Sequence, residues 1–308
     1  MEDAIRKYKT VFLLWMKQCD FLTDNLYSLL TFVIKAELMR DKIFRTLVFS
    51  NLFIALVALA MLYRTDQLWG LHLSHAVYVV IFFSTLLVYS IHSIASTDKD
   101  HIFRGIWNQR NRKLLYVFSG VSSIGIIYLL LSNPTYFISL SPVALLTAYY
   151  IFPRFDIKAL SNTRVYFKTL ILTVVWLYST SIFPIIISEK DPCSFKMLSF
   201  FAVEFVFLYL ICFFFDHRDR KTDPQHYIFF NPHRYPSIVV YAFASLFFIA
   251  ITVAILFKVD NLYLFLKSIL MLFVILTYKK SITTNSDVWF YLILDGLMGA
   301  DAIIFLIR

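Results

Sequence analysis

Three aspartates lie in one short polar stretch that directly follows a long apolar run. Asp216, Asp219 and Asp223 are spaced at i, i+3 and i+7, which places them within a roughly 60° arc if the stretch is helical. Carboxylates on one face repel each other unless a cation lies between them. Magnesium is the natural candidate, because it favours carboxylates together with the phosphate oxygens of a substrate.

Three cations, Arg218, Arg220 and Lys221, stand among these aspartates and would add positive charge for an anionic ligand. A second interpretation stays open. The stretch would then be a solvated loop after a membrane helix, with Asp216 and Arg220 forming an ordinary i, i+4 ion pair.

The elements that must position these residues are membrane helices. Of the 308 residues, 59% are apolar and only 16% are charged, and the mean hydropathy is +0.70. A soluble domain carries about 25% charged residues, so the composition excludes a soluble enzyme, and it is too apolar for a disordered chain. Three widely spaced cysteines indicate neither a disulfide framework nor structural zinc.

The sequence predicts an all-α fold, a polytopic membrane bundle of about nine transmembrane helices. A helix needs about 20 apolar residues to cross the hydrocarbon core. Polar or turn-forming stretches such as Asn231-Pro232 separate the candidates and leave little room for a soluble domain. The predicted spans are 44–63, 72–95, 114–132, 136–152, 167–188, 196–215, 237–257, 261–277 and 288–307.

Two regions are predicted. Residues 1–42 form an N-terminal cytoplasmic or interfacial amphipathic segment, and residues 43–308 form a single transmembrane domain. Charged residues interrupt the apolar pattern of 8–35, which favours a helix lying on the membrane surface, with a tenth crossing as the alternative. If the N-terminus is inside, 21 of the 29 Lys and Arg residues fall in inner segments and four in outer ones. This asymmetry predicts a cytoplasmic N-terminus and cytoplasmic aspartate-rich loops.

The stretch 215–223, Phe-Asp-His-Arg-Asp-Arg-Lys-Thr-Asp, resembles the second aspartate-rich motif, D-x-x-D-x-x-x-D, of the UbiA superfamily of intramembrane prenyltransferases. The stretch 148–153, Ala-Tyr-Tyr-Ile-Phe-Pro, is similar to the Tyr-Pro end of that family's fourth helix. A basic loop and Lys168 follow in the expected order. The resemblance covers about residues 43–308, and nine helices is the family's number.

The resemblance implies transfer of a prenyl group from an isoprenyl diphosphate to an aromatic or lipid acceptor dissolved in the membrane, with Mg²⁺ as the cofactor. It implies an integral protein of the bacterial inner (cytoplasmic) membrane. The expected partner is then the lipid bilayer, and no nucleic acid is expected to bind.

The same resemblance implies roles for individual residues. Lys168 and Arg164 would contact diphosphate oxygens. The alternative for Lys168 is a snorkelling residue at a helix end. Tyr149, Tyr150, Trp176 and Tyr178 are candidates to stabilise an allylic cation. Arg110 and Arg112 would close over the substrate, unless they belong to a solvated basic loop. The implied metal ligands are Asp216, Asp219 and Asp223, with Asp98 or Asp100 for a second ion.

The family's first motif, N-x-x-x-D-x-x-x-D, is only partly present in residues 89–100. Either alignment of the motif leaves one acid, Asp98 or Asp100, where the family has two. This departure favours a second hypothesis, a catalytically degenerate protein that binds polyprenyl lipid or acts as a scaffold. A transporter is the third.

Three acids lie deep in predicted spans: Glu204, Asp295 and Asp301. Buried ionisable residues in a membrane face the bundle interior and find partners. Hydrogen bonding between helices is the favoured role for all three, ahead of catalysis. Gly296 and Ala300 form a small-xxx-small pair suited to close helix packing.

Overall fold

The computed structural model describes residues 45–95, 102–151, 158–220, 236–284, 286–303 and 305. For 102–103, 158–167 and 219–220 the backbone alone is described. Contacts divide the chain into two units, 1–47 and 48–308, and the elements below belong to the second. The predictions for residues 8–35 lie outside the described residues.

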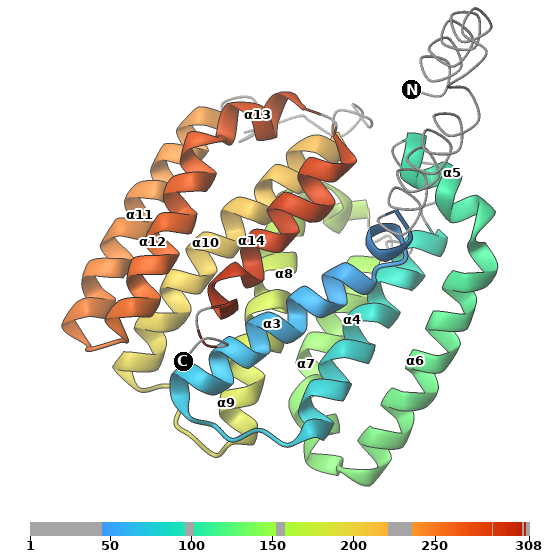
Figure 1. The fold of residues 1–308 in the computed structure, drawn as a ribbon, viewed down its shortest axis with the longest axis horizontal. Helices are drawn as coiled ribbons and strands as arrows, with labels where there is room; N and C mark the ends of the chain where they lie inside the picture. Colours follow the sequence, from blue (N-terminus) through green and yellow to red (C-terminus); the bar gives the residue numbers. More distant parts are fainter. Residues whose placement is uncertain are drawn as a thin grey trace, which may run out of the picture. The chain divides into compact units, whose positions relative to one another are not determined.

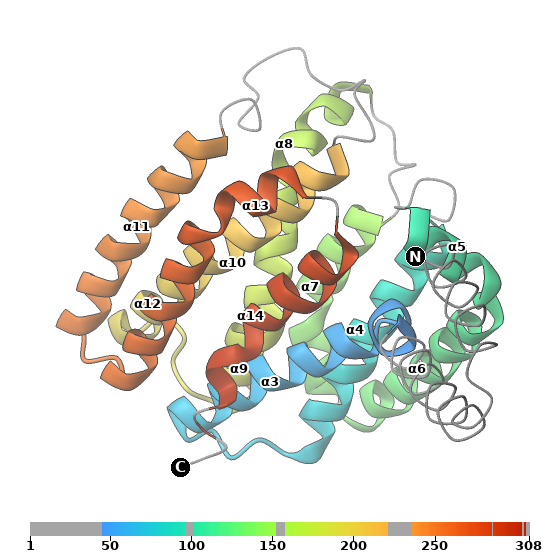
Figure 2. The ribbon, with the colours of Figure 1, turned by 45° about the horizontal axis from the view of Figure 1, so that its top comes forward.

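Every regular element in the described part of the chain is helical (Figures 1 and 2). The elements are α3 (Leu52–Trp69), α4 (His75–Ala95), α5 (Ile102–Arg110), α6 (Arg112–Ser132), α7 (Pro134–Ile151), α8 (Lys158–Leu177), the π-turn η1 (Tyr178–Ile182), α9 (Phe183–Ile187), α10 (Phe195–Arg220), α11 (Pro236–Leu256), α12 (Asn261–Leu276), α13 (Tyr278–Thr283), the π-turn η4 (Trp289–Leu294), α14 (Asp295–Gly299) and the 3₁₀ turn η5 (Ala300–Ala302).

Six spans of the described chain are long and apolar enough to cross a membrane: α3, α4, α6, 168–187, α10 and α11. Helix α10, which corresponds to the predicted span 196–215, is the most enclosed of the six. In its most apolar stretch 72% of the residues are buried, whereas in α6 only 11% are. The central place of α10 and the peripheral place of α6 follow from these values. The prediction of an all-α fold is confirmed for the described residues, and the six long apolar helices agree with a polytopic membrane protein.

Several of the predicted spans differ from the observed elements in their ends or their winding. Helix α3 continues to Trp69, where Gly70 takes a left-handed conformation (φ 53°) and its N–H bonds the carbonyl of Asp66. Glycine adopts this conformation without strain and so closes the helix. The predicted span 167–188 is interrupted by η1. Pro184 cannot donate a hydrogen bond to the preceding turn, which accounts for the widened winding there.

The predicted loop 96–113 instead contains a nine-residue helix, α5. It is too short and too polar to be recognised as a membrane span. Its buried side chains are polar, Arg104 and Asn108, and Arg104 donates hydrogen bonds to residues of two other segments. Tertiary contacts, rather than hydropathy, therefore hold this helix in place.

Close packing between α3 and α14 occurs at Gly299 rather than at the predicted Gly296. A Cβ atom on Gly299 would lie 3.0 Å from the Cβ of Ala60 and 3.2 Å from the carbonyl oxygen of Val57, whereas one on Gly296 would meet only the Phe53 ring, at 3.6 Å. Two backbones approach closely here because no side chain stands between them.

Gly299→Ala should therefore lower the melting temperature of the purified chain by about 2–10 °C, since the added methyl group overpacks a backbone contact. Gly120→Ala on α6 is the matched control, because a Cβ there would have nothing within 4 Å. It should leave the melting temperature unchanged or raise it slightly. Thermal unfolding of both variants in one detergent checks the prediction, and equal melting temperatures would contradict it.

Candidate functional site

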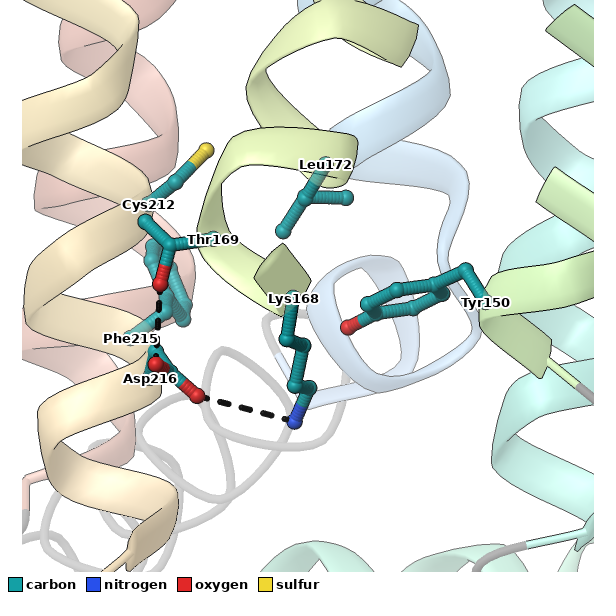
Figure 3. A pocket seen from close by; sticks show the side chains of 7 residues that line it. All are labelled: Tyr150, Lys168, Thr169, Leu172, Cys212, Phe215 and Asp216. Carbon is teal, nitrogen blue, oxygen red and sulfur yellow. Dashed lines mark hydrogen bonds and ion pairs between the residues drawn. The ribbon is translucent and has the colours of Figure 1, made fainter. Parts of the chain in front are cut away.

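A small pocket opens where α7, α8 and α10 meet (Figure 3). Its cavity volume is about 20 Å³, which is enough for about one water molecule. Its lining combines one acid, one cation, a hydroxyl, a thiol and apolar or aromatic side chains. The lining residues are Tyr150, Lys168, Thr169, Leu172, Cys212, Phe215 and Asp216.

Asp216 is the acid of this pocket and is only 4% exposed. The Thr169 hydroxyl donates a 2.8 Å hydrogen bond to its Oδ2 atom, and the Nζ atom of Lys168 lies 3.9 Å from its Oδ1 atom. Its described cationic neighbour thus comes from α8. The alternative of a solvated loop is wrong for Asp216, because α10 stays helical through Arg220 and buries this carboxylate.

Lys168 stands at the mouth of the pocket with its side chain 40% exposed. Its ammonium lies 5.8 Å from the centre of the Tyr150 ring, and Figure 3 shows Asp216 and Tyr150 on opposite sides of it. A half-exposed ion pair at this distance contributes little to stability. The exposed part of the Lys168 side chain can be reached by an anion from solvent.

Tyr150, not the neighbouring Tyr149, lines the pocket. The Tyr150 ring stacks on His92 of α4, with ring centres 6.1 Å apart. Two turns along α8 from Lys168, the indole N–H of Trp176 donates a 3.2 Å hydrogen bond to the hydroxyl of Tyr89. Aromatic side chains from α4, α7 and α8 thereby line the bundle interior below the pocket.

A second polar group lies beside the pocket and shares Phe215 with it. The guanidinium groups of Arg104 and Arg218 lie 4.4 Å and 4.7 Å from the centre of the Tyr291 ring. Arg218 also donates a 2.9 Å hydrogen bond to the Tyr291 hydroxyl and lies 5.3 Å from the centre of the Phe215 ring. We call Arg104, Tyr291 and Arg218 the arginine–tyrosine stack.

Arg218 is the only member of this stack that was singled out from the sequence, whereas Arg104 and Tyr291 were missed. The Nη2 atom of Arg104 donates 2.9 Å hydrogen bonds to the side chains of Asn51 and Ser93. The signal available was two apolar pairs, at 102–103 and 106–107, four residues apart, because this spacing fits a short amphipathic helix. Only the fold, however, brings Asn51 and Ser93 to Arg104.

Asp295 is a buried acid of α14, 7% exposed. It interacts electrostatically with both Arg104 and Arg218. Together with the pocket, three cations and two carboxylates lie in neighbouring positions at one end of the bundle. These five groups carry one more positive than negative charge, which favours an anionic ligand.

The remaining predicted residues are placed as follows. Arg110 and Arg112 are exposed where α5 meets α6, and Arg112 lies 5.6 Å from the centre of the Tyr116 ring. Their substrate-binding role stays a prediction. The predictions for Asp98, Asp100 and Asp223 fall outside the described residues, as do those for the side chains of Arg164 and Asp219.

The donor set at this pocket is compatible with magnesium. In the described part of the chain no three His, Cys, Asp or Glu residues gather closely enough to hold a metal ion. Asp216 offers a buried carboxylate at the pocket, and the helical backbone continues to Asp219 one turn later. Magnesium is commonly held by one or two carboxylates together with substrate phosphates and waters, so this arrangement fits it.

No protein-family model, curated protein or solved structure matches the chain.

Proposed function

We propose that this chain is an integral membrane prenyltransferase that transfers a prenyl group from an isoprenyl diphosphate to an acceptor dissolved in the bilayer. The observation that carries the proposal is the pairing of Lys168 with Asp216 at the mouth of a pocket with an aromatic wall. These are the residues to which the UbiA-like motifs assign diphosphate and metal binding. The proposal includes nine crossings, with the pocket at the cytoplasmic end.

Binding of the diphosphate would begin at Lys168. Its ammonium, held 3.9 Å from Asp216, would turn to the phosphate oxygens, and Arg164 would add a second positive charge from one turn earlier on α8. Asp216, Asp219 and Asp223 would hold magnesium at the end of α10. When bound, the metal would neutralise the diphosphate as it leaves.

The pocket in its described form holds about one water molecule, so substrate binding requires Lys168 to move away from Asp216. The exposure of its side chain permits this movement. The prenyl tail would leave through the wall of the bundle into lipid.

The aromatic side chains would protect and stabilise the reacting carbon. Rings facing an allylic cation contribute about 1–2 kcal/mol each when water is excluded. Tyr150 lines the pocket, while Trp176 and Tyr89 hold one another below it. We assign the exclusion of water to this wall.

The proposal is tested with the purified full chain in liposomes, radiolabelled prenyl diphosphates and a lipid extract as the source of acceptors. Label should move into lipid-soluble product with magnesium and should stay in the diphosphate with EDTA. The proposal would be overturned if the chain showed no transfer and also no magnesium-dependent binding of the prenyl diphosphate.

A second candidate is a degenerate protein that binds polyprenyl lipid without transferring it. The incomplete first motif favours it, because either alignment leaves one acid, Asp98 or Asp100, where the family has two. Magnesium-dependent binding of a non-hydrolysable prenyl diphosphate, with no transfer in the same preparation, would identify this case.

A further inference from the structure

Four charged side chains form a closed ring inside the bundle, apart from the pocket. We call Arg64, Glu204, Lys267 and Asp301 the charge ring. The Nη1 atom of Arg64 lies 3.1 Å from Glu204 and 3.0 Å from Asp301. The Nζ atom of Lys267 lies 2.9 Å from Glu204 and 2.6 Å from Asp301. Each cation therefore contacts both acids, and each acid contacts both cations.

The ring is electrically neutral and fully enclosed. All four side chains are 0% exposed, and they come from apolar helices. An uncompensated charge is costly in such surroundings, whereas alternating charges compensate one another. The ring therefore tolerates burial as a set, and the loss of any one member leaves a net charge.

Aromatic side chains close the ring on its flanks. The Tyr263 hydroxyl donates a hydrogen bond to Glu204. The ammonium of Lys267 lies 4.4 Å from the centre of the Phe207 ring, and the guanidinium of Arg64 lies 5.9 Å from the ring centres of Phe200 and Tyr263. These surroundings leave the charged groups no described route to solvent.

The ring joins three long helices to an irregular stretch near the C-terminus. Arg64, Glu204 and Lys267 come from α3, α10 and α12, whereas Asp301 lies in η5. We call η4, α14 and η5 together the C-terminal segment (289–302). The close approach at Gly299 also holds it to α3, and beyond it the Tyr63 hydroxyl donates to the carbonyl of Phe305 at 3.1 Å.

The same segment carries Tyr291 and Asp295, which lie at the arginine–tyrosine stack. Its winding changes from π to α to 3₁₀ within fourteen residues. A stretch without one regular helical repeat has its rotation set by tertiary contacts. Asp301, at the opposite end of the segment from Tyr291, supplies such a contact.

We infer that the charge ring acts as one electroneutral unit that fixes the rotation and depth of the C-terminal segment, and so positions Tyr291 and Asp295 between Arg104 and Arg218. This role makes no use of the proposed transfer reaction. It predicts that the net charge left in the ring, rather than the number of altered side chains, determines the loss of stability.

Three variants of the full chain test this inference. Asp301→Asn leaves a net charge of +1, Asp301→Asn with Glu204→Gln leaves +2, and Asp301→Asn with Lys267→Met restores neutrality. The single variant should lose on the order of 10 °C in melting temperature. The +2 variant should lose more, and the neutral double variant should recover most of the loss. Equal losses in the two double variants, or losses that simply add, would overturn the inference.

Hydrogen–deuterium exchange tests the positioning directly. Peptides from 289–302 should exchange faster in the charged variants than in the parent and the neutral double variant, while peptides from α6 should stay unchanged. Asp66→Asn is the matched control, because Asp66 is a buried acid of α3 that bonds Tyr78 and lies outside the ring. Equal acceleration in α6 and the C-terminal segment would overturn the positioning role.

If Asp301→Asn does not accumulate, recovery of folded protein by the added Lys267→Met supports the inference and failure to recover contradicts it.

Discussion

Asp216→Asn should reduce magnesium-dependent prenyl transfer on the order of 100-fold or more and leave the bundle folded. The amide keeps the size of the carboxylate and still accepts the hydrogen bond of Thr169. It loses the negative charge that a divalent cation requires of this ligand. The melting temperature should change little, since the Thr169 hydrogen bond is kept and the ion pair with Lys168 is long, with the lysine side chain 40% exposed.

The measurement is label transfer at several magnesium concentrations, beside thermal unfolding of the same preparation. Asp66→Asn serves as the control. This acid is also buried, and it accepts hydrogen bonds from Tyr78 and from the backbone of Leu73. It should retain transfer even if its stability falls. Full activity of Asp216→Asn at limiting magnesium would remove the metal role from this residue.

Lys168→Met should weaken prenyl diphosphate binding by about 10–100-fold, because a charge-assisted hydrogen bond contributes about 1.5–3 kcal/mol. The methionine keeps the apolar stem of the side chain and removes only the ammonium. Lys168→Arg should restore part of the binding. Retention of a radiolabelled non-hydrolysable analogue by the chain in liposomes measures the effect.

Lys196→Met is the matched cation control for this measurement. Its ammonium lies 5.2 Å from the centre of the Trp69 ring, and Trp69 ends α3 at the opposite end of that helix from Asn51. The Lys196→Met variant should bind the prenyl diphosphate analogue as the parent chain does. If Lys168→Met also binds the analogue normally, Lys168 is a snorkelling residue at a helix end, the alternative that its position in the sequence left open.

Much of this fold follows from hydropathy alone. The apolar runs of 72–95 and 196–215 recur as α4 and α10 with small shifts of their ends, because a membrane helix satisfies its own backbone and needs only an apolar surface. The partners of Glu204 and Asp301 follow from the same physics only in part. Burial demands a partner, and helix-to-helix bonding is confirmed for both acids.

The identity of those partners could not be predicted. Arg64 directly follows the predicted span 44–63 and Lys267 lies inside the predicted span 261–277, but sequence spacing says nothing about which helices become neighbours. Arg104 was hidden for a similar reason, since its bonding groups on Asn51 and Ser93 are joined to it only by the tertiary fold. At the candidate site, Lys168 and Asp216 meet because α8 and α10 pack together.

The charge ring has a consequence for how the chain is made. Synthesis proceeds from the N-terminus, so Arg64 enters the membrane well before Glu204, and Lys267 follows before Asp301 is added. Until Asp301 arrives, the first three members hold one cation too many in an apolar interior. A chain interrupted between 267 and 301 would therefore carry an unbalanced charge among apolar helices, and such a charge is costly to bury.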